Sequence, residues 1–119
     1  MLCTIESIKA ILSSDYFEGH KVPPDNQLEI QANVIADEIL GVVTMYGYEK
    51  PAENTDFYKY LASTNVMGVA AIVAKRLFPM QSQNKNEFQD KYDKMLQRII
   101  DHSWISYYTD TTVEDDRQW

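Results

Sequence analysis

Residues 57–78 have the sequence FYKYLASTNVMGVAAIVAKRLF, and this stretch decides the fold. Its middle, residues 66–74, has no polar residue on any face, so a helix here is predicted to be enclosed by protein all round. Gly68 costs about 1 kcal/mol relative to alanine inside a helix, which predicts that the backbone is closely packed at this position. Pro79 ends the helix, because proline lacks the backbone N–H and its ring cannot continue the ladder.

Two helices are expected before this central one. A short helix follows Thr4, which is suited to be its N-cap. A long helix is predicted over residues 26–46, where Asn26 and Glu29 have the spacing of a capping box and Gly47 is suited to the C-terminal end. The apolar residues at helical spacing are Ile5, Ile8, Ile11 and Leu12 in the first, and Leu28, Ala32, Ile35, Ile39, Val42 and Tyr46 in the second. Asn54 or Thr55 can then cap the central helix.

After the polar residues that follow Pro79, an amphipathic helix is predicted over residues 86–102, on the outside of the bundle. Residues 104–119 differ in character, because aromatic and β-branched residues alternate with a period of two and an acidic end follows. The predicted fold is therefore all-α: a small bundle of three long helices with a short N-terminal helix. We expect residues 1–103 to form this helical domain and residues 104–119 to form an extended C-terminal arm.

Composition narrows the possible functions. The chain has 119 residues and a net charge of −7, with its basic residues scattered, which argues against nucleic acid as the main partner. Apolar runs are too short for a membrane span and no signal-peptide pattern is present, so a cytosolic protein, or one assembled there, is expected. Cys3 is the single cysteine and is expected to be a plain thiol.

Residues suited to catalysis are few. His20 and His102 stand apart from any second histidine or cysteine at metal-ligand spacing. Residues 114–116 are three successive acids, which lack the alternation of ligands found in a calcium loop. The sequence has no phosphate-binding glycine loop and no nucleophile motif. We therefore expect a protein that is not an enzyme and that uses no metal or other cofactor.

Aromatic residues are the more informative signal. Many of them fall at helix ends or in connecting segments, and tyrosine and tryptophan are frequent anchors of protein interfaces. The alternative is that they close the ends of the bundle, which is at least as well supported for Trp104. The predicted interface residues are Tyr16, Phe17, His20, Tyr48, Tyr107, Tyr108, Val113 and Trp119.

The order and pattern of these elements resemble a known group of proteins. The stretches that carry the resemblance are IQANVIADEILGVV (30–43), YGYEKP (46–51), NVMGVAAIVAKRLF (65–78) and FQDKYDKMLQRII (88–100). Together they look like the small all-α head-tail connector proteins of tailed bacteriophages, also called adaptor or head-completion proteins. Residues 104–119 depart from that pattern.

The resemblance implies a structural virion protein at the head-tail interface, assembled in the host cytoplasm. Such proteins form a ring, usually a dodecamer, that docks under the portal protein, binds a tail-completion or tail protein, and lets DNA pass without specific binding. A second hypothesis is a small helical regulatory or adaptor protein that binds one protein partner through its C-terminal arm. An enzyme or metal protein that uses His20 or His102 is the third.

Overall fold

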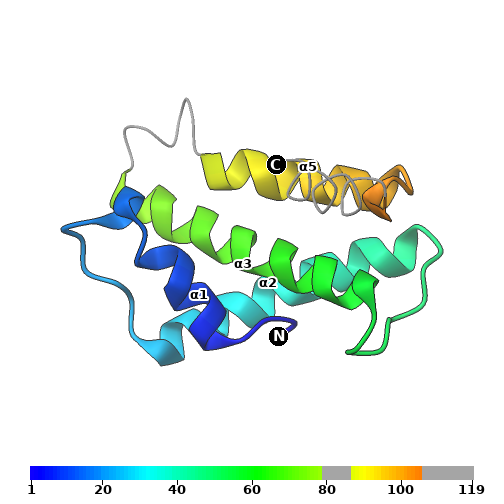
Figure 1. The fold of residues 1–119 in the computed structure, drawn as a ribbon, viewed down its shortest axis with the longest axis horizontal. Helices are drawn as coiled ribbons and strands as arrows, with labels where there is room; N and C mark the ends of the chain where they lie inside the picture. Colours follow the sequence, from blue (N-terminus) through cyan, green and yellow to red (C-terminus); the bar gives the residue numbers. More distant parts are fainter. Residues whose placement is uncertain (79–86, 106–119) are drawn as a thin grey trace, which may run out of the picture.

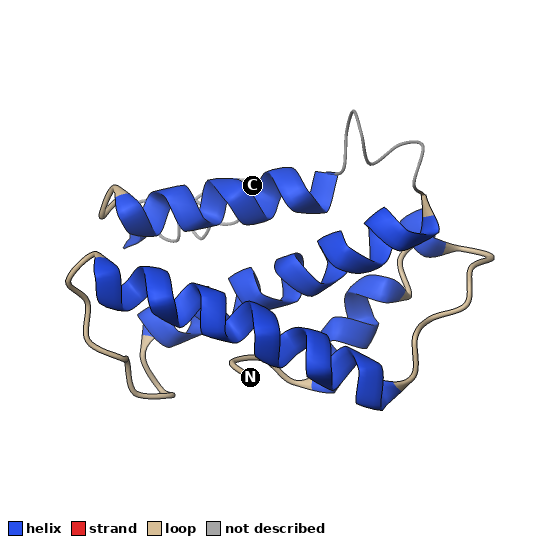
Figure 2. Cartoon of the chain, turned by 180° about the vertical axis from the view of Figure 1, so that it is seen from behind, coloured by secondary structure: helices blue, strands red, loops and turns tan. Residues whose placement is uncertain are grey.

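The computed structural model describes residues 1–78 and 87–105, and this part of the chain is helical and contains no strand (Figure 2). The all-α prediction is confirmed. The elements are α1 (Ile5–Leu12), a 3-10 turn (Asp15–Phe17), α2 (Asp25–Met45), α3 (Asp56–Leu77) and α5 (Glu87–Ile100). The long helices begin and end within two residues of the predicted bounds.

Helix α3 lies in the middle of the molecule, with α5 along one side and α1 and α2 on the other (Figure 1). It packs against all three, as its apolar sequence predicts. Enclosure is not complete, however, because Met67 and Ile72 are only half-buried. These two positions correct the prediction that every face of residues 66–74 is covered. The reason is that three neighbouring helices leave part of the circumference of α3 open.

Gly68 is the point of closest packing. A Cβ atom placed there would lie 2.6 Å from Ile35 Cγ2 on α2 and 3.0 Å from Tyr92 Cε1 on α5. The absence of a side chain at this position therefore lets both helices approach α3 at the same level, and the close packing predicted at Gly68 is confirmed. Tyr92 is buried and its hydroxyl donates a hydrogen bond of 2.5 Å to Glu38 Oε1 on α2, which ties α5 to α2 across this contact.

The predicted caps of α1 and α3 are confirmed. Thr4 accepts a hydrogen bond from the backbone N–H of Ser7, whose hydroxyl is in turn bonded to the Thr4 backbone, and Thr55 accepts one from the N–H of Tyr58. The predicted capping box at Asn26 is wrong. Helix α2 begins one residue earlier, after Pro24. Proline has the φ of −67° that this position adopts, whereas the Asn26 side chain accepts from the adjacent N–H of Gln27.

Helices α2 and α5 end in the same way. After α2, Gly47 has a φ of +88°, its N–H bonds to Thr44 O, and the Tyr48 N–H bonds to Val43 O. This is a Schellman motif, which satisfies carbonyl groups at the helix end, and it confirms the prediction for Gly47. After α5, His102 takes the left-handed position with a φ of 58°, and the Ser103 N–H bonds to Arg98 O. The chain thus turns back on itself directly after α5.

The buried polar residue Asn65 joins three segments. Its Oδ1 accepts from the backbone N–H of Leu2 at 2.9 Å, and its Nδ2 donates to Ala32 O at 3.1 Å. The side chain is fully buried, so these bonds replace water for groups that would otherwise lose it. Asn65 thereby fixes the N-terminal segment and α2 against α3.

The predicted boundary at residue 103 does not coincide with the edge of the packed body. Trp104 lies against the bundle, with its ring 4.7 Å from that of Phe57 and 5.8 Å from that of Tyr60. Trp104 and Ile105 also have helical backbone rather than the extended backbone predicted for the arm. The remainder of the predicted arm, 106–119, lies outside the described residues.

Candidate functional site

A first aromatic cluster closes one end of the bundle, where the turn after α1 meets the end of α3 and the start of α5. Its members are Tyr16, Phe17, His20, Phe78 and Phe88. Tyr16 makes edge contacts with Phe17, Phe78 and Phe88 at 5.0–5.2 Å between ring centres, and the exposed His20 lies 4.6 Å from Phe78. Phe17 is 2% exposed, so its ring is part of the core of its own chain. Tyr16 and His20 keep exposed surface.

A second aromatic cluster closes the opposite end, where α2 and α5 end and α3 begins. It consists of Tyr48, Phe57, Tyr60, His102 and Trp104. The Tyr48 ring stacks between Phe57 at 4.8 Å and His102 at 4.7 Å, and its hydroxyl donates to Ile99 O at 2.7 Å. Burial raises the pKa of Tyr48, which keeps this hydroxyl a donor. Tyr48 therefore packs within its own chain and stabilises this end of the bundle, as Trp104 does.

Four of the predicted interface residues, Tyr107, Tyr108, Val113 and Trp119, lie outside the described residues. The structure therefore places four of the eight and divides them between two ends of the bundle. Tyr16, Phe17 and His20 share the first aromatic cluster, and Tyr48 belongs to the second. The described interface residues do not form one continuous surface.

The outer face of α2 is an apolar surface that the sequence analysis did not identify. Ile30, Val34 and Met45 are exposed by 63%, 59% and 76%, and Gly41, which has no atom within 4 Å of an added Cβ, lies on the same side of the helix. The signal was available in the sequence. Ile30 and Val34 are four residues apart and out of phase with Leu28, so α2 carries a second set of apolar residues besides the one that faces the core, with the exposed Asp37 between Val34 and Gly41 on the same side.

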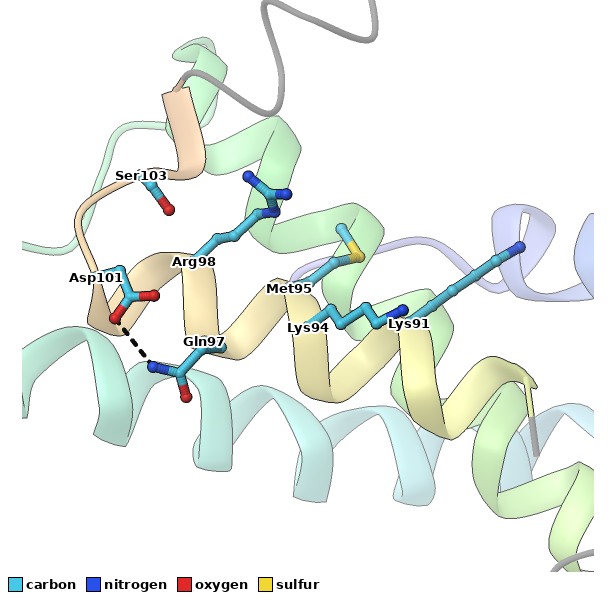
Figure 3. A pocket seen from close by; sticks show the side chains of 7 residues that line it. All are labelled: Lys91, Lys94, Met95, Gln97, Arg98, Asp101 and Ser103. Atoms are coloured by element: carbon cyan, nitrogen blue, oxygen red, sulfur yellow. Dashed lines mark hydrogen bonds between the residues drawn. The ribbon is translucent and has the colours of Figure 1, made fainter. Parts of the chain in front are cut away.

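A basic pocket on α5 is the other surface that the sequence did not reveal. It is an open depression of about 360 Å³, and the side chains that line it project from α5 and from the turn after it (Figure 3). The lining residues are Lys91, Lys94, Met95, Gln97, Arg98, Asp101 and Ser103. They carry three positive charges and one negative charge, in a chain whose net charge is −7. Gln97 holds Asp101 by a hydrogen bond of 2.9 Å.

Groups that could take part in chemistry are dispersed. Cys3 is buried, and burial raises the pKa of its thiol, which disfavours the reactive thiolate. His20 and His102 belong to the aromatic clusters at opposite ends of the bundle. Within residues 1–78 and 87–105, no three histidine, cysteine or acidic residues are grouped so as to hold a metal ion. No described helix is both long and apolar enough to cross a membrane.

Comparison with protein-family models, with curated proteins and with solved structures found no match for this chain.

Proposed function

We propose that the chain is a structural protein of a tailed bacteriophage: a head-tail connector that forms a ring under the portal protein and joins the capsid to the tail. The observation that carries this proposal is the apolar outer face of α2. Three large apolar side chains there are more than half exposed to solvent, and such surfaces are typical of sites that other protein molecules cover. In a ring, the neighbouring copy would cover them.

The construction of the bundle supports a structural role. The aromatic clusters brace both ends, and α2, α3 and α5 meet closely at Gly68. A subunit of a ring must keep its shape while its faces bind different neighbours, and a braced helical body does this. Tyr16 and His20, at one end, are available for a contact with the portal or with a tail protein.

Charge also agrees with a passage for DNA. The net charge of −7 would give a ring of such subunits an overall negative charge, which repels phosphate. DNA could then slide through the ring without specific binding. The basic pocket on α5 is the exception, and in this proposal it faces away from the channel.

The test is assembly. We expect the purified chain to form rings, alone or on portal particles of the same phage, as measured by native mass spectrometry and negative-stain microscopy. Val34→Lys should prevent ring formation, because it places a charge in the subunit contact. Ala10→Lys, which adds the same charge at an exposed position of α1, is the matched control and should assemble normally.

The connector proposal would be refuted if the chain stayed monomeric at all concentrations and did not bind portal particles. If that monomer instead bound one protein partner through residues 104–119, the adaptor hypothesis would replace it. Normal assembly of Val34→Lys would show that α2 is not the contact surface.

A further inference from the structure

The basic pocket on α5 has the features of a binding site for an acidic segment. Lys91, Lys94 and Arg98 are spaced by three and four residues, which puts them on one face of the helix. Neither Lys91 nor Lys94 forms an ion pair with another described residue. Met95 and the other lining residues add apolar and hydrogen-bonding surface between these charges.

The chain itself leads into this pocket. The Schellman motif at His102 reverses its direction after α5, and Ser103, which directly follows, is one of the lining residues (Figure 3). Trp104 then lies against Phe57 and Tyr60, so the position from which the remaining residues start is fixed. The C-terminal segment is therefore joined to the chain three residues after Ser103, which lines the pocket.

Residues 106–119 have a complementary charge. They contain the four acids Asp110, Glu114, Asp115 and Asp116 and the single base Arg117, a net charge of −3. Fourteen residues can span up to about 46 Å at about 3.3 Å per residue, whereas α5, with 14 residues, is about 21 Å long. The segment is long enough to run back along α5 and bring its acids to Lys91.

We propose that the basic pocket on α5 binds the acidic C-terminal segment, residues 106–119, of the same chain. The tether decides for the same chain over a second copy, because a short linker gives the segment an effective concentration on the order of millimolar at the pocket. Ion pairs at such an exposed site are individually weak, so at micromolar protein concentrations binding between separate molecules would be negligible. This inference is independent of ring formation.

The contact would also regulate the arm. While its acids lie on α5, the segment cannot reach a partner, and a stronger acceptor elsewhere would release it. Because the attraction is between exposed charges, it weakens as salt is raised and the Debye length falls to about 3 Å at 1 M.

Paramagnetic relaxation enhancement in the full chain tests the proposal. A nitroxide is attached at Thr112→Cys in a Cys3→Ala background, and the amide signals of the ¹⁵N-labelled protein are recorded. We expect the signals of Lys91, Lys94 and Arg98 to lose at least half of their intensity. Signals of Lys9, on α1, which lies on the other side of α3 from α5 (Figure 1), serve as the internal reference and should be unaffected.

Charge-reversal variants test whether the loss of α5 signal depends on attraction between opposite charges. Lys91→Glu with Lys94→Glu should restore most of the lost α5 intensity, while Lys50→Glu with Lys59→Glu, which changes two exposed charges elsewhere, should leave it reduced. Adding Glu114→Lys, Asp115→Lys and Asp116→Lys to the first pair should bring the loss back. Thermal melting by circular dichroism confirms that each variant is folded.

Three results would overturn the proposal. No loss of signal on α5 would mean that the segment lies elsewhere. A loss of α5 signal that is unchanged in Lys91→Glu with Lys94→Glu would mean that the pocket does not bind the segment through charge. A loss in a mixture of ¹⁵N-labelled chain without nitroxide and unlabelled chain with nitroxide would mean that the segment binds a second copy.

Discussion

Replacing Gly68 with alanine is expected to destabilise the bundle, whereas the same replacement at Gly41 is expected to stabilise it. Both glycines lie inside helices, so alanine gains about 1 kcal/mol of helix propensity at either site. At Gly41 the new methyl group meets nothing within 4 Å. At Gly68 it would lie 2.6 Å from Ile35 Cγ2 and 3.0 Å from Tyr92 Cε1.

Neither neighbour of Gly68 can move away easily. Ile35 is β-branched and sits in a helix, where one rotamer is strongly preferred, and the Tyr92 ring is held by the hydrogen bond from its hydroxyl to Glu38. Overpacking of this kind costs about 1–3 kcal/mol. Gly68→Ala should therefore lie about 1–3 kcal/mol below Gly41→Ala in free energy of unfolding, with a net loss of up to about 2 kcal/mol against the original chain.

Urea denaturation followed by circular dichroism at 25 °C measures both variants. For a domain of this size, 1 kcal/mol corresponds to about 4 °C in Tm, so thermal melts provide a second measure. Equal stabilisation by the two substitutions would refute the reasoning, since it would mean that α2 and α5 do not press against α3 at Gly68.

Three further predictions concern the packing around α3. Asn65→Leu should lower the free energy of unfolding by about 1–3 kcal/mol, because it leaves the buried N–H of Leu2 without a partner and removes the bond to Ala32 O; urea denaturation measures this, and an unchanged midpoint would contradict it. Val69→Asp should unfold the chain whereas Ile72→Asp should still melt cooperatively, because Val69 is fully buried and Ile72 is half-buried; circular dichroism distinguishes the two. Burial, and then the hydrogen bond to Glu38, raise the pKa of Tyr92 above its ordinary value of 10.0, so its contribution to stability is complete below pH 10 and is lost as the pH rises further. Tyr92→Phe should accordingly lose less stability than the original chain between pH 10 and 11.5, and parallel losses would argue against this role for Tyr92.

The sequence was sufficient to predict the helices because their signals are local. The caps at Thr4 and Thr55 and the C-terminal glycine at Gly47 depend only on nearby residues. The predicted start of α2 was wrong for a related reason: Asn26 and Glu29 have the right spacing, but Pro24 already supplies the required backbone angle two residues earlier.

The aromatic residues show what the sequence could not supply. Tyr48 and Phe17 are of the residue types that are frequent in interfaces. Within the chain, however, Phe17 packs against Phe88, and Tyr48 packs against Phe57 and donates a hydrogen bond to Ile99 O. Which helix ends meet depends on the arrangement of the bundle, and no local pattern encodes it. The same holds for the basic pocket, since Ser103 joins it only because the chain reverses at His102.

Helix α5 is held at both of its ends. Near its start, Phe88 packs among Tyr16 and Phe17, and at its finish the Tyr48 hydroxyl grips the carbonyl of Ile99. Because α5 is held at both ends, we expect it to separate from the bundle as one unit and not to unravel from one end. The spacing between Lys91 and Lys94 on α5 is consequently fixed, and a molecule that binds both must match that spacing.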